Sequence, residues 1–309
     1  MKIYSIFDDF DRLAADKLIG AGHELTVLPK GQSRPTGKAL QEILEDYDCI
    51  IIGTGQKISV EMFSNITSPK IIATASTGVD HITVPEDKKH LITVLNTPGA
   101  NAAAVAEYII GAALNCCRRL AEGRLLYQES KDNKKLRAKP VELGEKTLGV
   151  IGAGSVSREL INLASAFHMN IICWTPHPER HPEIFEGKAK NLSLEELASR
   201  ADIISLNMPD CSETHGLISS ELIRKMKTDA IFISVSRLSL IDIAALTKKA
   251  KENPSFYVCL DLDPDPDLVN GISRLSNVYI TPHIAGGTVE SRIRMFRKAA
   301  ERINSFANH

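Results

Sequence analysis

Short apolar runs alternate with amphipathic helical patterns along almost the whole chain. Strands that alternate with helices are typical of parallel α/β architecture. The runs form one series in the first third and a second series that begins at Thr147. The strands we expect are Lys2–Ile6, Glu24–Leu28, Cys49–Ile52, Lys70–Ala75, Thr93–Leu95, Thr147–Ile151, Asn170–Trp174, Asp202–Leu206, Ala230–Val235, Tyr257–Leu260 and Val278–Ile280. Two series in 309 residues predict two doubly wound parallel sheets, each in its own domain.

An alanine-rich apolar segment, Ala100–Leu120, separates the two series. Its composition predicts a long and mostly buried helix, with Asn101 as the N-terminal cap. Amphipathic helices are also expected at Phe10–Ala21 and Gly37–Glu45. The polar stretch Gln128–Lys139 is interpreted as a solvated connector rather than a nucleic-acid patch.

Composition excludes several function classes. The hydrophobic fraction is 43% and the formal net charge is −1, so we expect no nucleic-acid or membrane partner. The opening MKIYSIFDDF lacks the layout of a signal peptide, which predicts a cytoplasmic protein. The six cysteines show no CxxC spacing and are expected to be reduced thiols. Because the histidines share no ligand spacing, we predict no metal.

A glycine-rich turn follows the first strand of the second series. The strand runs into Gly152 and Gly154 and then into a helix that opens with Ser155 and Val156. The first glycine permits the tight turn, and the second lets a pyrophosphate approach the backbone at the helix N-terminus. Ser157 stands where a third glycine is usual and is small enough to pack the helix on the strand. The context predicts a dinucleotide-binding site.

The end of the next strand bears on the choice between NAD and NADP. An acid there normally accepts hydrogen bonds from the adenosine ribose, but this chain has Thr175. His177 and Arg180 are candidate partners for a 2′-phosphate, which favours NADP slightly over NAD. In the alternative, Thr175 or Glu179 binds the ribose hydroxyls and Arg180 is surface charge.

Several motifs occur together in one order along the chain. They are Ser76–Ile82, Asn96–Asn101, Val105–Glu107, the Gly152 turn, Ala201–Pro209, Ile231–Asp242, Cys259–Pro266 and Asn277–Thr288. In this order the sequence resembles the D-isomer-specific 2-hydroxyacid dehydrogenases, in particular the glyoxylate and hydroxypyruvate reductases. The resemblance covers essentially the whole chain.

The resemblance implies roles for four residues in the reduction of a 2-keto acid. Arg237 matches the substrate-binding arginine, whose planar fork suits a carboxylate. His283 matches the general acid/base, and imidazole is suited to proton transfer near neutral pH. The backbone N–H groups of Thr77 and Gly78 match the donors to the substrate carboxylate.

Further positions match the family's cofactor-binding residues. Asp261 corresponds to the acid near the nicotinamide carboxamide. Pro209, Val235 and Ser236 correspond to residues that line the cofactor.

One departure concerns the acid that pairs with the histidine. In the family a glutamate stands five residues after the position of Asp261, where this chain has Pro266. A one-residue deletion would align Asp265 with that glutamate, and we expect Asp265 to pair with His283, with Asp263 as the second choice. The altered acid leaves a specialised substrate or lost activity open.

The resemblance also implies a domain organisation. A Rossmann cofactor domain, 99–286, is expected to be inserted into a flavodoxin-like substrate domain formed by 1–98 and 287–309. Ligands bind open α/β sheets at the carboxyl ends of the strands, so the active site is expected there, in the cleft. A homodimer through the cofactor domains is implied.

The predicted function is hydride transfer between NAD(P)H and a small 2-keto acid or D-2-hydroxy acid. Two alternatives stay open: a non-catalytic NAD(P)-sensing protein, and a dehydrogenase of other chemistry such as formate oxidation. Intact Arg237 and His283 argue against the first alternative. The acids beside Asp261 argue against the second, because formate has no carbonyl to protonate.

Overall fold

The computed structural model describes residues 1–130, 139–263, 265 and 270–308. The chain forms two compact units: a first unit of Met1–Asn101 with Thr288–His309, and a second unit of Ala102–Gly287. The boundaries expected from the sequence, 98/99 and 286/287, lie three residues and one residue earlier. Most of the expected connector Gln128–Lys139 lies outside the described residues.

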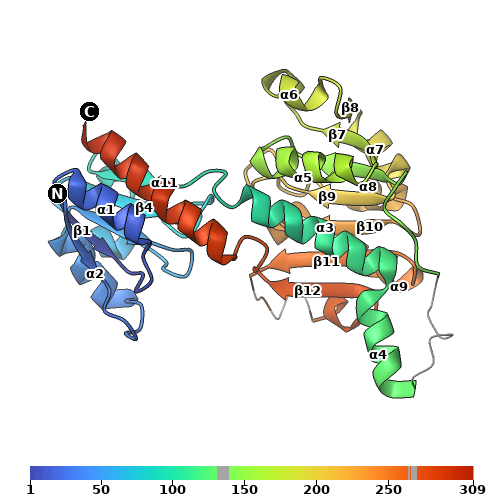
Figure 1. Ribbon diagram of the computed structural model, residues 1–309, viewed down its shortest axis with the longest axis horizontal. Helices are drawn as coiled ribbons and strands as arrows, with labels where there is room; N and C mark the ends of the chain where they lie inside the picture. The colour runs from blue at the N-terminus through green and yellow to red at the C-terminus, as the bar shows by residue number, and fades with distance from the viewer. Residues whose placement is uncertain (131–138, 264, 266–269, 309) are drawn as a thin grey trace. The chain divides into compact units, whose positions relative to one another are not determined.

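The first unit, blue to cyan with the red C-terminal helix in Figure 1, contains a five-stranded parallel sheet. Its strand order is β2-β1-β3-β4-β5, which is the flavodoxin-like order. Its strands are β1 (Lys2–Ser5), β2 (Glu24–Val27), β3 (Cys49–Ile52), β4 (Lys70–Thr74) and β5 (Ile92–Leu95). Its helices are α1 (Arg12–Gly20), α2 (Gly37–Asp46) and α11 (Val289–Ala307), with short 3₁₀ turns at Val60–Phe63 and Glu86–Lys88. The expected strands are confirmed to within a residue or so.

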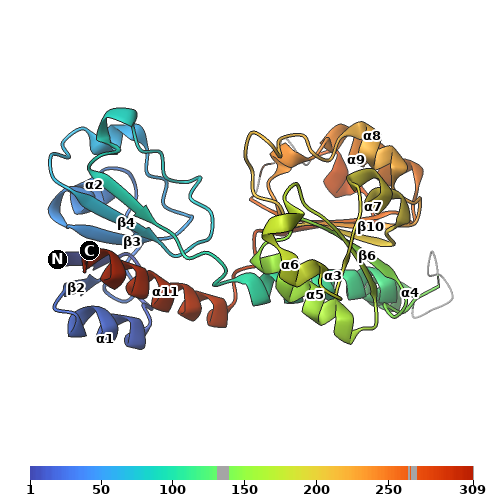
Figure 2. The ribbon, with the colours of Figure 1, turned by 90° about the horizontal axis from the view of Figure 1, so that it is seen from above.

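Helices cover both faces of this sheet: α1 and α11 lie on one face and α2 on the other (Figure 2). Every residue of β3 and β4 is buried, as expected for parallel strands covered on two sides. Asp11 caps α1 and also accepts hydrogen bonds from Arg297 of α11, at 2.9 Å from Nε and 3.3 Å from NH2. The C-terminal helix is thereby tied to the N-terminal part of the chain.

The second unit contains a seven-stranded parallel sheet in the order β12-β11-β10-β9-β6-β7-β8. Counted from its first strand this is 7-6-5-4-1-2-3, the Rossmann order with one added strand. The strands are β6 (Thr147–Ile151), β7 (Asn170–Trp174), β8 (Lys190–Asn191), β9 (Ile203–Leu206), β10 (Ile231–Ser234), β11 (Tyr257–Leu262) and β12 (Val278–Pro282). Only the two-residue edge strand β8 was not expected from the sequence.

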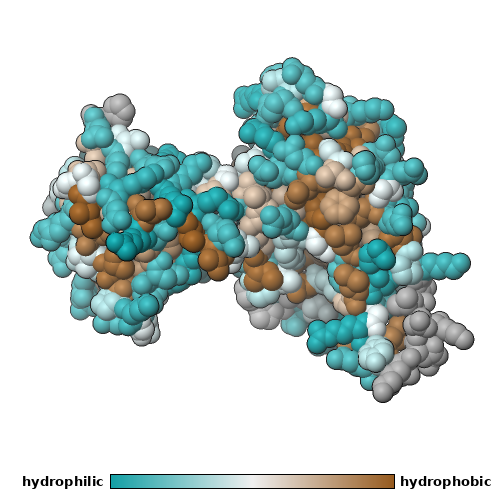
Figure 3. Space-filling model, viewed as in Figure 1, coloured by the Kyte–Doolittle hydropathy of each residue, from teal (hydrophilic) through white to brown (hydrophobic). Residues whose placement is uncertain are grey.

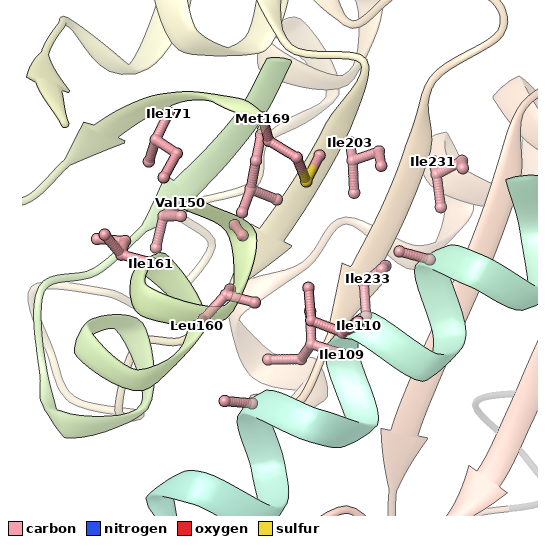
Figure 4. Close-up of a cluster of buried hydrophobic side chains, with 14 of the residues drawn as sticks. Ile109, Ile110, Val150, Leu160, Ile161, Met169, Ile171, Ile203, Ile231 and Ile233 are labelled. Carbon is pink, nitrogen blue, oxygen red and sulfur yellow. The ribbon is translucent and has the colours of Figure 1, made fainter. Parts of the chain in front are cut away.

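Helices again lie on both faces, with α3 and α5 on one side and α7, α8 and α9 on the other (Figure 2). The helices are α3 (Ala102–Arg118), α4 (Leu120–Ser130), α5 (Ser155–Ala166), α6 (Pro182–Phe185), α7 (Leu194–Arg200), α8 (Ser220–Lys225) and α9 (Ile243–Glu252), with 3₁₀ turns at Pro178–Arg180, Leu238–Leu240 and Ile272–Arg274. Between α3, α5 and the sheet, Ile109, Leu160 and Ile233 are fully buried (Figure 4). This core holds the strands whose ends carry the site.

The expected helix Ala100–Leu120 is shorter than predicted. It begins at Ala102 and ends at Arg118, and Arg119 takes a left-handed backbone conformation with φ of 57°. That residue stacks its guanidinium on the Tyr257 ring, 4.3 Å from the centroid. The chain then continues as α4, which was not predicted. No helix in the described part of the chain is long and apolar enough to cross a membrane.

Candidate active site

The predicted site residues of the second unit follow the carboxyl ends of its strands. Gly152 directly follows β6, Thr175 follows β7 and His283 follows β12, while Pro209 and Arg237 lie three residues beyond β9 and β10. Because all strands of this sheet are parallel, their carboxyl ends form one edge. The edge of the sheet therefore gathers residues that are far apart in the sequence.

The Gly152 turn has the geometry that a dinucleotide pyrophosphate needs. Gly152 has φ of 109°, and a Cβ there would lie 2.8 Å from the carbonyl oxygen of Asn207. A Cβ on Gly154 would meet nothing within 4 Å, so the backbone is open to a ligand. Gly154 precedes α5, which begins at Ser155 and has no side-chain cap on its first N–H groups. These unpaired donors and the helix dipole fit a phosphate.

Ser157 and the residues around Ser236 pack the rest of this edge. Ser157 is completely buried, as its proposed packing role requires. Ser236 Oγ donates to the carbonyl of Leu206 at 3.1 Å and accepts from the N–H of Met208 at 3.0 Å. It thus joins the loop after β9 to the loop after β10. Val235 is partly buried against the core.

The carbonyl of Pro209 accepts a 2.6 Å hydrogen bond from Thr214 Oγ1. The loop that carries the predicted cofactor-lining proline is therefore closed on itself.

The end of β7 carries no carboxylate. Thr175 is buried there, 8% exposed. Beyond it, Glu179 Oε1 lies 3.4 Å from His177 Nδ1 and 3.9 Å from Arg180 Nε. Both candidate cations for a 2′-phosphate thus share one exposed acid.

Arg237, Asp263 and His283 form a cluster at the ends of three adjacent strands, β10, β11 and β12. Asp263 Oδ1 lies 2.7 Å from His283 Nδ1, and Asp263 Oδ2 lies 3.7 Å from Arg237 NH1. The side chains stay accessible, with 33%, 67% and 36% exposure for the arginine, aspartate and histidine. His283 has φ of 52°, in the left-handed region that residues other than glycine rarely adopt. Strained backbone of this kind is common at functional positions.

The acid beside His283 is the second of the two candidates. Asp263 makes the 2.7 Å contact. Asp265, the first choice, lies two residues further along, is partly buried and is not without interactions of its own. Pro266, which replaces the family's glutamate, lies outside the described residues. Within the described ranges, no group of three or more His, Cys, Asp or Glu side chains is placed to hold a metal ion.

Asp261 has a structural task that the sequence did not indicate. It is only 4% exposed, and both of its carboxylate oxygens accept hydrogen bonds from the loop around His283. Oδ1 accepts from the Thr281 hydroxyl at 2.5 Å and from the Ile284 N–H at 2.8 Å, and Oδ2 accepts from the Ala285 N–H at 2.8 Å. Two of these hydrogen bonds hold the backbone directly after the histidine, and the third holds the Thr281 side chain before it.

The predicted substrate loop of the first unit follows β4. Asn96 Nδ2 donates to the carbonyl of Thr77 at 2.7 Å, and Ser76 Oγ donates to that of Gly78 at 2.7 Å. Thr77 Oγ1 donates to Asn101 Oδ1 at 3.1 Å. No hydrogen bond within the described part of the chain uses the backbone N–H of Thr77 or Gly78. The loop is held by its carbonyls and side chains while two adjacent donors stay available.

Comparison with known proteins gives the family. Residues 110–285 match the model of the family described as "D-isomer specific 2-hydroxyacid dehydrogenase, NAD binding domain". The chain is 34% identical over 268 residues to the hydroxypyruvate reductase of Thermotoga maritima. This match covers 85% of this chain and 86% of the relative. The chain therefore belongs to the D-isomer-specific 2-hydroxyacid dehydrogenase family. It is an enzyme of nicotinamide-dependent oxidoreduction of 2-hydroxy and 2-keto acids.

Two further matches show the breadth of the family. The chain is 33% identical over 274 residues to the D-3-phosphoglycerate dehydrogenase of Methanocaldococcus jannaschii, covering 87% of this chain but only 52% of that longer protein. Among solved structures, an acyclic imino acid reductase in complex with NADPH and D-Arg superposes with a TM-score of 0.84 at 26% identity, covering 100% of this chain and 96% of the other. The family and fold are thus shared by proteins named for different substrates.

Proposed function

We propose that the protein reduces small 2-keto acids to D-2-hydroxy acids and catalyses the reverse oxidation. The observation that carries this proposal is the cluster of Arg237, Asp263 and His283, in which one carboxylate contacts both a carboxylate-binding cation and an imidazole. Reduction of a 2-keto acid needs these two functions: a cation for the substrate carboxylate and an acid for its carbonyl oxygen.

The Gly152 turn would hold the pyrophosphate of the dinucleotide, whose nicotinamide would supply or take up the hydride. Arg237 holds the substrate carboxylate and polarises the adjacent carbonyl. His283 Nδ1 donates to Asp263, which leaves Nε2 to give a proton to the carbonyl oxygen during reduction and to take it back during oxidation. The family resemblance assigns the role of further carboxylate donors to the backbone N–H groups of Thr77 and Gly78.

Asp263 takes the place of the family's glutamate as the partner of His283. Its carboxylate orients the ring through the 2.7 Å hydrogen bond to Nδ1. Asp261 is a positioning residue, since its three hydrogen bonds hold the loop that carries His283 in a left-handed conformation. An aspartate side chain is one methylene shorter than that of the family's glutamate. Asp263 stands two residues after Asp261, whereas the glutamate stands five residues after that position, and we propose that the position nearer to the strand compensates for the shorter side chain.

We propose a modest preference for NADPH over NADH. Thr175 at the end of β7 places no negative charge beside the adenosine ribose, and Arg180 is 68% exposed with a long 3.9 Å contact to Glu179. Arg180 can therefore turn to a 2′-phosphate. Arg180→Gln should raise the KM for NADPH about fivefold more than the KM for NADH. Equal changes for both cofactors would contradict this assignment.

We propose a homodimer through the second unit. Leu120, Leu125 and Tyr127 on α4 are 59%, 58% and 67% exposed, an uncommon density of large apolar side chains on one helix. Apolar side chains also gather over α3 on the face shown in Figure 3. Light scattering coupled to size exclusion should give twice the chain mass, and Leu125→Glu with Tyr127→Glu should give the monomer. A monomeric wild type would refute the proposal.

The proposed activity is tested with purified protein, a panel of small 2-keto acids including glyoxylate, hydroxypyruvate and pyruvate, and both reduced cofactors. Loss of reduced-nicotinamide absorbance with at least one keto acid, and a D-configured product, is the expected result. Tight cofactor binding with no turnover on any member of the panel would instead favour a sensing role.

A further inference from the structure

A hollow in the second unit lies at the amino ends of the strands, at the edge of the sheet opposite to the Gly152 turn. Its volume is about 810 Å³, within the range of small-molecule sites. Thr147 and Asn170, the first residues of β6 and β7, lie in its wall, together with Lys190 of β8. At about 3.3 Å per residue, the five residues of β6 place it about 16 Å from Gly152. It is therefore separate from the proposed dinucleotide site.

The wall of this hollow carries positive charge only. Lys188, Lys190, Arg200 and Lys227 line it, and none of its described lining residues carries a carboxylate. The chain as a whole has a formal net charge of −1, so the charge is concentrated locally. A concave wall of one sign focuses the field and attracts the opposite charge.

Two of the four cations, Lys188 and Lys190, have no carboxylate partner among the described residues. Lys227 is neutralised by Asp202, at 2.8 Å. Lys188, by contrast, donates to the uncharged amide of Asn162 at 3.0 Å, and in the described part of the chain the Lys190 ammonium has no recorded ion pair or hydrogen bond. The pKa of Glu196, one turn before Arg200, is lowered first by the hydrogen bonds from Ser193, 2.8 Å for the hydroxyl, and also by the charge of Arg200.

Helix-end electrostatics account for only one of these charges. Arg200 ends α7, where a cation complements the helix dipole. Lys188 and Lys190 lie between α6 and the end of β8, outside any helix, so the dipole gives no reason for them.

The floor of the hollow is apolar. Met169 and Ile171 are each 8% exposed, and the ring of Phe185 is partly buried against the same core. An apolar floor below a cationic rim suits a molecule with an apolar body and one or more anionic groups. An inorganic anion alone would leave the floor unused.

We propose that this hollow binds a small organic anion, in which an apolar or aromatic body rests on Met169, Ile171 and Phe185 and a phosphate or carboxylate group meets Lys188, Lys190 and Arg200. The site is distinct from the dinucleotide turn and does not depend on the proposed substrate.

Titration with the fluorescent probe anilinonaphthalene sulfonate, in the presence of saturating NAD⁺, tests the proposal. The test variant is Lys190→Glu with Arg200→Glu, and both side chains are exposed, so the fold should tolerate the change. The matched control is Lys248→Glu with Lys251→Glu, two exposed lysines of α9 that do not line the hollow. Circular dichroism and thermal unfolding confirm that each variant is folded.

We expect saturable binding of the probe to the wild type and the control, and binding weakened about tenfold or more in the test variant. Pyrophosphate and citrate should compete, and the stronger competitor distinguishes a phosphate ligand from a carboxylate ligand. Equal affinity in all three proteins, or no saturable binding of the probe to the wild type with NAD⁺ present, would overturn the proposal. Because no turnover is measured, this result is independent of the proposed reaction.

Discussion

Replacing Asp263 by asparagine tests which acid supports the histidine. The carboxylate makes a 2.7 Å hydrogen bond to His283 Nδ1, and hydrogen bonds to charged groups are worth about 1.5–3 kcal/mol. Asp263 is 67% exposed, so solvent screens the interaction and the lower half of this range applies. With about 1.4 kcal/mol per factor of ten, kcat/KM should fall about tenfold to fortyfold.

The matched control is Asp265→Asn, two residues further along the same acidic loop. Steady-state rates of keto-acid reduction are measured for both variants, with cofactor affinity measured separately by fluorescence quenching. We expect Asp265→Asn to change kcat/KM less than threefold and both variants to bind cofactor normally. A loss in Asp265→Asn that equals or exceeds the loss in Asp263→Asn would refute the assignment.

Four further variants test the substrate arginine, the glycine turn and the cap of α1. Arg237→Gln should lower kcat/KM about a hundredfold, because the substrate carboxylate loses its charged partner. The cofactor Kd should stay within about twofold of the wild-type value. A raised cofactor Kd would contradict substrate binding by Arg237. Gly152→Ala should cost about 1–3 kcal/mol of unfolding free energy, since φ is 109°. Gly154→Ala should keep the wild-type free energy of unfolding but bind the dinucleotide about tenfold more weakly. Denaturant and binding titrations measure both quantities. A destabilised Gly154→Ala with unchanged dinucleotide affinity would contradict the turn's proposed role. The Arg297 hydrogen bond, and that from the Ala14 N–H, lower the pKa of Asp11 despite its burial, so its contribution is present at neutral pH and disappears as pH falls through the folded pKa. Asp11→Asn should therefore destabilise by about 1 kcal/mol near neutral pH and by less in acid, as urea unfolding at two pH values would show; an equal loss at both would contradict the linkage.

The sheets could be predicted from the sequence because their strands are short, apolar and β-branched and are bounded by polar turns. β6 and β10 begin and end within a residue of the expected positions. β8 could not be predicted, because two exposed residues at a sheet edge carry no periodic pattern. The end of α3 at Arg119 could not be predicted for a different reason. The left-handed backbone of Arg119 is supported by stacking of its guanidinium on Tyr257, which lies far away in the sequence.

The site could be predicted as a set of residues but not as a set of contacts. His283 directly follows β12 and Arg237 lies three residues beyond β10, so strand order brings them to one edge of the sheet. The pairing of His283 with Asp263 depends on the path of a short loop of alternating aspartates and prolines, and alignment alone favoured Asp265. The hydrogen bonds of Asp261 to the loop around His283 depend on the register of β11 against β12.

The central claim is that His283 transfers the proton during reduction of a 2-keto acid. The most direct measurement compares the wild type with His283→Gln for turnover of hydroxypyruvate and glyoxylate, with cofactor affinity titrated on the same preparations. The account predicts D-configured product from the wild type, and a loss of turnover of about a hundredfold or more in the variant with cofactor binding unchanged. Turnover that survives the substitution would contradict it.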